Sequence, residues 1–132
     1  MASPIKPIGA IGAIYQQQRN ALIQSRYREI YAHEQAHKAA AGSFGGAIVI
    51  EKNAEGIPVG GHVNIKMPKL NKANPEETIK HANTVIKAAL APNDPSSQDI
   101  KVAGEANAIK QQATAEKRKF DKIETKSTPT NS

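Results

Sequence analysis

The sequence predicts an α+β fold in which a long helix comes first, a β-hairpin follows it, and two further helices complete the domain. Three observations predict this order. Apolar residues at helical spacing stop at Gly42, two β-branched runs flank a turn, and two later segments open with helix-capping residues. A chain of 132 residues has room for one such domain, with short ends, and for a small core.

The first helix is expected from Tyr15 to Ala41, because Gly42 suits the left-handed position that ends a helix. The preceding residues 1–14 contain Pro4 and Pro7 and carry isoleucine at every third position from Ile5. Proline opposes a helix there. We therefore predict that residues 1–14 form a flexible apolar arm, suited to docking on a partner protein.

The next elements are two strands and two helices. Residues 47–52 and 57–66 are rich in β-branched side chains and flank the turn sequence Asn-Ala-Glu-Gly, which indicates a hairpin. A helix is expected to begin at Pro75, and another after Ser96, with Asp99 three residues on as in a capping box. The predicted domain spans residues 15–119, and residues 120–132 are predicted to form a disordered basic and polar tail.

Composition excludes several classes of protein. The chain has no cysteine, so disulfide scaffolds, thiolate metal sites and cysteine nucleophiles are ruled out. Its net charge of +6 is thinly spread and aromatic residues make up only 4%, so nucleic-acid binding is not favoured. No apolar run is long enough to predict a transmembrane helix, and the N-terminus does not resemble a signal peptide. The cytoplasm is the default expectation, with recruitment to a larger assembly as a further option.

The segment His-Glu-Gln-Ala-His, residues 33–37, carries the chemistry. Two histidines four residues apart lie on one side of a helix, where both imidazoles can bind one Zn²⁺. Glu34 lies beside them and is the expected catalytic base, which deprotonates a water on the metal. The alternative is a pair of structural histidines with Glu34 paired to Lys38 one turn later.

A catalytic zinc usually takes a third protein ligand, which must come from elsewhere in the chain. His62 is the first candidate, because Gly60 and Gly61 before it would let the helix approach the strand closely. Strand alternation, however, places His62 on the face opposite Val63. Asp99 is an alternative third ligand. It is also expected to cap its helix, or to accept a hydrogen bond from the far nitrogen of a ligand histidine.

The chain resembles a known family along residues 27–115. The resemblance rests on HEQAH followed by KAAAGSFGG, on VGGHV, on PEETI, and on AALAPNDPSSQD followed by VAGEANA, in this order. These motifs resemble the SprA-related family, which is assigned on its motif as bacterial metallopeptidases. In that family the residue after the glycine pair is acidic, whereas this chain has His62.

The resemblance implies a minimal zincin-like, zinc-dependent metallopeptidase domain, with His33 and His37 as metal ligands and Glu34 as the base. The implied substrate is a peptide or protein. A second hypothesis is a catalytically silent structural or adaptor component of a larger bacterial assembly. The small domain and the isoleucine-rich arm at residues 5–14 favour this second hypothesis.

Overall fold

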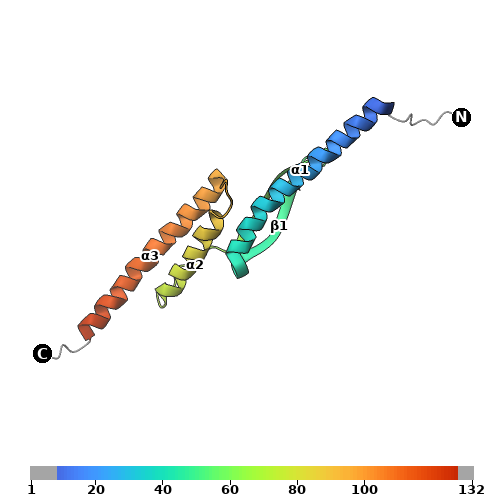
Figure 1. Ribbon diagram of the computed structural model, residues 1–132. Coiled ribbons are helices and arrows are strands. Elements are labelled where there is room, and N and C mark those ends of the chain that lie inside the picture. Colours follow the sequence, from blue (N-terminus) through green and yellow to red (C-terminus); the bar gives the residue numbers. More distant parts are fainter. Residues whose placement is uncertain (1–8, 128–132) are drawn as a thin grey trace.

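The computed structural model describes residues 9–127, and its elements follow the predicted order (Figure 1). Helix α1 (Gly9–Ala41) leads through the short 3-10 helix η1 (Gly42–Phe44) to the antiparallel strands β1 (Gly45–Lys52) and β2 (Pro58–Ile65). Helices α2 (Pro75–Ala89) and α3 (Ser97–Ser127) follow. The predicted α+β class is confirmed, with the HEQAH segment inside the first helix.

Two helix boundaries differ from the prediction. Helix α1 begins at Gly9 rather than at Tyr15, because after Pro7 every backbone N–H is available and alanine and isoleucine continue the helix. It ends as predicted, since Gly42 adopts a left-handed φ of 57°. Helix α3 continues through residues 120–127, which were expected in the tail. Residues 1–8 of the predicted arm and 128–132 of the predicted tail lie outside the described residues.

The hairpin lies along α1 and is held to it at both ends. At its tip, the Asn53 side-chain oxygen accepts hydrogen bonds from the backbone N–H of Glu55 and of Ile57, each at 3.0 Å, and so shapes the loop. The Arg19 guanidinium of α1 donates to the carbonyl of Glu55. At the other end, Lys38 of α1 donates to the carbonyl of Gly46 at 2.8 Å. These contacts fix the position of the sheet on the helix.

Close approach of the hairpin to α1 depends on Gly61 in β2. A Cβ built at Gly61 would lie 2.7 Å from Cγ2 of Ile30 and 2.9 Å from the carbonyl oxygen of Val49. No heavy atom outside the local chain lies within 4 Å of a Cβ at Gly60. The predicted role of the glycine pair is therefore confirmed for the second glycine, which faces the helix.

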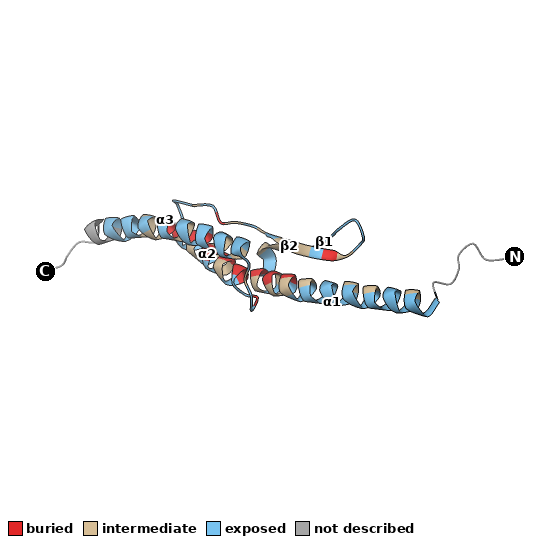
Figure 2. Cartoon of the chain, turned by 90° about the horizontal axis from the view of Figure 1, so that it is seen from above, coloured by how far each residue is buried: buried red, intermediate tan, exposed pale blue. Residues whose placement is uncertain are grey.

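Small side chains form the core, which lies mainly between α2 and α3, an antiparallel pair (Figure 1). The completely buried residues there include Ala82, Val85, Ala88, Ala106 and Ala113. Alanine allows two helix backbones to pack closely, and the C-terminal part of α1 joins this core (Figure 2). Among the described residues, no helix has the length and hydropathy that a membrane span requires.

Candidate metal centre

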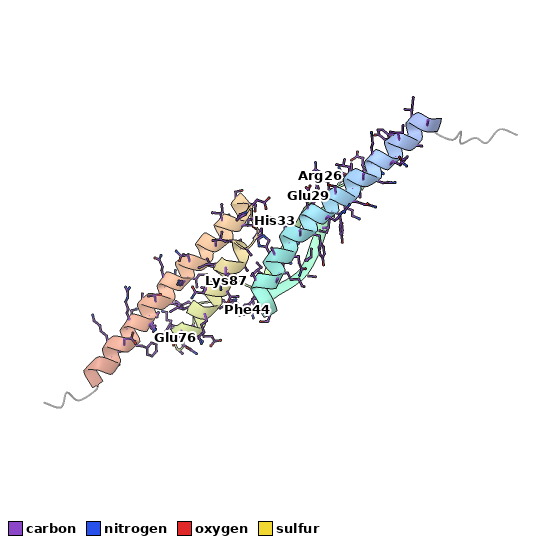
Figure 3. All side chains as sticks on the ribbon, viewed as in Figure 1. Arg26, Glu29, His33, Phe44, Glu76 and Lys87 are labelled. Atoms are coloured by element: carbon purple, nitrogen blue, oxygen red, sulfur yellow. The ribbon has the colours of Figure 1, made fainter. Side chains whose placement is uncertain are left out.

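The HEQAH segment lies in the C-terminal half of α1, where the helix meets the rest of the molecule (Figure 3). Glu34 is 6% exposed and His37 is 4% exposed, while His33 is partly buried. One ligand atom from each of His33, Glu34 and His37 lies within 4.8 Å of the others. The helix has therefore brought the three polar groups together on its buried side, as the spacing predicted.

A carboxylate from the first turn of α3 completes the cluster. Oδ2 of Asp99 lies 3.1 Å from Nε2 of His33 and 3.1 Å from Nε2 of His37, and the two Nε2 atoms are 3.2 Å apart. The three atoms thus form a nearly equilateral triangle. Metal–ligand bonds of about 2.0–2.1 Å in a tetrahedral zinc site place neighbouring ligand atoms about 3.3 Å apart. The triangle matches one face of such a tetrahedron, so these residues fit a metal ion.

The far nitrogens of both histidines are held by acceptors. Nδ1 of His37 donates to the carbonyl oxygen of Ala88 in α2 at 2.8 Å, so this nitrogen carries the proton. Nδ1 of His33 lies 3.4 Å from Oδ1 of Asp94, which also accepts. With the proton on Nδ1, a neutral imidazole presents the lone pair of Nε2 to the centre of the triangle. Such outer contacts are typical of histidines that ligate a metal.

Asp99 has a second role at the start of α3. Its Oδ2 accepts a hydrogen bond from the backbone N–H of Ser96 at 2.9 Å, and the Ser96 hydroxyl accepts from the backbone N–H of Asp99 at 3.0 Å. The capping box expected from the sequence is therefore present. Burial would raise the pKa of the Asp99 carboxyl, but the Ser96 bonds and the nearby His37 outweigh it and lower the pKa. The carboxylate is thus ionised beside the histidines.

Glu34 is in a different electrostatic position. Burial raises the pKa of its carboxyl above the ordinary value and Asp99 adds to this effect, while His37 and His33 oppose it. Among the described residues, the Glu34 carboxylate forms no hydrogen bond, and because no fully buried side-chain oxygen lacks a partner, its oxygens retain contact with solvent. A carboxylate that is mostly buried but opens to the cleft is available to accept a proton from a water held there.

The cluster lines a cleft of about 630 Å³ between α1, β2 and the first turns of α3. Residues 60–65 of β2 all line this cleft. Successive residues of a strand point to opposite faces, so six in a row can line one cleft only if the cleft runs along the edge of the strand. Strand β2 pairs with β1 on one side, and its other edge therefore faces the cleft.

His62 lines the cleft but does not join the triangle. Its Nδ1 lies 3.0 Å from Oε1 of Glu51, and its side chain is 46% exposed. Helix α1 covers the strand face that carries Gly61, whereas His62 projects from the opposite face. Its role as a metal ligand stays a prediction.

Sequence reasoning placed Asp99 near the site but missed two contacts, those of Asp94 and the Ala88 carbonyl. Asp94 lies in an exposed loop between α2 and α3, and a backbone carbonyl has no residue signature, so only the tertiary contact identifies either one. The position of Asp94 just before Pro95, in a loop that leads to a helix cap, is the one signal that the sequence offers.

Comparison with known proteins gives one match. The model of the SprA-related family matches residues 10–127, which extends the resemblance seen in residues 27–115 at both ends. No match is found among curated proteins or among solved structures.

Proposed function

Because the chain belongs to the SprA-related family, we propose that it is a zinc-dependent metallopeptidase whose metal is held by His33, His37 and Asp99. The observation that carries this proposal is the triangle of Nε2, Nε2 and Oδ2 atoms with sides of 3.1–3.2 Å. Two imidazoles and one carboxylate are a ligand set used by catalytic zinc, which keeps a fourth position open. When bound, zinc lowers the pKa of its water to about 7 and polarises a carbonyl.

The residues of the chain supply the remaining steps. The Glu34 carboxylate takes a proton from the attacking water as the water oxygen bonds to the peptide carbonyl carbon. Glu34 then returns this proton to the amide nitrogen as the C–N bond breaks, which releases an amine and a carboxylic acid. The Ala88 carbonyl and Asp94 hold the two imidazole rings in place throughout.

The free edge of β2 supports a peptide as the substrate. Its unpaired N–H and C=O groups line the cleft beside Glu34 and can pair with an extended peptide, as an added strand would. Such pairing places one peptide bond of the substrate over the histidines. This arrangement recognises the main chain of the substrate and therefore accepts peptides of many sequences.

The direct test measures zinc and cleavage separately. The purified protein is expected to bind one zinc per chain after reconstitution, and His33→Ala to lose it. Glu34→Gln is expected to retain the zinc and to lose about 10²–10⁴-fold in peptide cleavage, because the base is removed but no ligand is. His81→Ala, a histidine outside the cluster, is the control for both measurements. Failure of the wild type to bind zinc would overturn the proposal.

One observation favours the adaptor hypothesis as a second candidate. The first turns of α1 project beyond the hairpin, and they expose Ile11 at 85%, Tyr15 at 67% and Ile14 at 53% (Figure 2). Under the adaptor hypothesis, the metal would only stabilise the fold or would not be bound. Zinc binding without cleavage of any peptide, together with a stable partner that is lost on deletion of residues 1–14, would support the adaptor role over the enzyme.

A further inference from the structure

The charge of the cleft is opposite to that of the chain. Basic residues outnumber acidic ones by 18 to 12 in the sequence. Five carboxylates nevertheless line the cleft, and among the described residues no lysine or arginine does: the five are Glu29, Glu34, Asp94, Asp99 and Glu105. A bound divalent cation would offset two of these negative charges and leave an excess of three. The cleft thus remains anionic when the metal centre is filled.

The carboxylates outside the metal cluster extend along both walls. Glu29 lies on α1 one helical turn before His33, and Figure 3 shows the two side by side on that helix. Glu105 lies on the opposite wall, further along α3 than Asp99. Asp94 lies in the loop at one end. A substrate that spans the centre would therefore meet negative charge on both sides of the bond to be cut.

Lysine and arginine of the protein do not neutralise these charges. Within the described part of the chain, neither Glu29 nor Glu105 forms an ion pair with a cationic side chain, although Arg26 and Lys101 are one helical turn away from them. Glu34 lines the same cleft and forms no hydrogen bond within the described chain, and since no fully buried side-chain oxygen lacks a partner, its carboxylate retains contact with solvent. Glu29 and Glu105 are exposed and solvated in the free protein, so both carboxylates are available to a cationic group of a ligand in the cleft.

Apolar side chains accompany the carboxylates. Ile30, Val63 and Val102 line the same walls. This combination fits lysine and arginine, which bury an aliphatic stem against apolar surface and present a cationic end group. A small inorganic cation would not contact the apolar walls, so these walls would add nothing to its binding. An acidic peptide would be repelled by the carboxylates.

We infer that the cleft selects peptides with lysine or arginine within a few residues of the bond over the metal centre, and that Glu29 and Glu105 determine this selectivity. The inference rests on the proposed function for the position of the bond, but the preference concerns binding and is measured without turnover. It goes beyond main-chain pairing at β2, which does not distinguish side chains.

The experiment uses zinc-reconstituted Glu34→Gln protein and fluorescence anisotropy of three labelled peptides that differ only at two central residues, Lys-Lys, Ala-Ala or Glu-Glu. The Lys-Lys peptide is expected to bind about tenfold more tightly than Glu-Glu at low salt, with the gap closing as salt screens the charges. Glu29→Gln and Glu105→Gln, each added to this protein, are expected to weaken Lys-Lys binding about threefold. The control Glu55→Gln removes the same charge from the hairpin loop and should change nothing.

The outcomes separate this inference from the proposed function. Equal affinity for the Lys-Lys and Glu-Glu peptides, or equal effects of Glu29→Gln and Glu55→Gln, would overturn the inference even if the wild-type protein cleaves peptides. Conversely, a Lys-Lys preference that Glu29→Gln and Glu105→Gln reduce would support it even if the zinc-loaded wild type cleaves none of the three peptides. That second result would contradict the proposed hydrolase activity and would indicate a protein that binds basic peptides without cleaving them.

Discussion

Two hollows of similar size have opposite charge. The metal-site cleft measures about 630 Å³ and is lined by carboxylates. The second hollow, of about 610 Å³, lies where the chain leaves β2 and enters α2; we call it the lysine groove, because Lys66, Lys69, Lys72 and Lys80 line it. Each contains histidine and charged side chains, yet within residues 9–127 the cleft alone holds a group of His, Asp or Glu side chains close enough to share a metal ion.

The histidines explain the difference. In the lysine groove, the His81 ring stacks on Phe44 with centroids 3.8 Å apart, and its Nε2 donates to the carbonyl oxygen of Lys66 at 2.7 Å. That nitrogen therefore carries a proton and has no lone pair for a metal. In the cleft, Nδ1 of His37 donates to the carbonyl oxygen of Ala88, and Nε2 of His37 points to Nε2 of His33 and Oδ2 of Asp99. Each neutral imidazole keeps one ring nitrogen free, so the neighbours make the difference: among the described residues, the group of side chains close enough to share a metal contains His33, Glu34 and His37 and not His81.

The largest effect that would test this comparison concerns the third ligand. Asp99→Asn keeps an oxygen that can cap α3 but removes the anionic ligand, so zinc affinity should fall by more than about 100-fold. His62→Ala, on the cleft wall, and His81→Ala, in the lysine groove, should leave zinc affinity unchanged when it is measured by competition with a chelator. Loss of zinc from His62→Ala and not from Asp99→Asn would make His62 the third ligand instead.

A smaller effect is expected at Asp94, which touches a histidine but not the centre of the triangle. Asp94→Ala removes the acceptor for Nδ1 of His33 and should lower zinc affinity about 10–100-fold. The side chain is 91% exposed, so the thermal midpoint of the metal-free protein should not change. Asn93→Ala, the preceding loop residue, is the matched control. Equal zinc affinities for the two variants would show that Asp94 does not orient His33.

The last prediction concerns stability rather than zinc affinity, at the wall between the helix and the hairpin. Gly61→Ala would place a methyl group against Ile30 and the Val49 carbonyl, so the free energy of unfolding should fall by about 1–3 kcal/mol in urea denaturation. Gly60→Ala has open space and should be close to neutral. Neither glycine lines the lysine groove, so these variants test the metal-site cleft alone. Equal stability of the two variants would mean that α1 does not need the close approach.

Particular residues show which features of the fold and of the site could be predicted from the sequence. The fold class, the end of α1 at Gly42, the capping box of Ser96 and Asp99, and the grouping of His33 with His37 all depend on residues a few positions apart. Local backbone geometry governs such relations, so they can be read directly from spacing. The start of α1 was misplaced because Pro7 excludes a helix only in its own neighbourhood.

The sequence alone determined the pair of imidazoles, because four residues on a helix bring two side chains to the same side whatever surrounds them. Only the tertiary structure decided which carboxylate closes the triangle, since Asp99 and His33 lie 66 positions apart and meet through the packing of α1 on the α2–α3 pair. The same packing gathered negative charge from both walls into one cleft of a basic protein. No spacing rule encodes that, because it depends on how whole helices lie against one another.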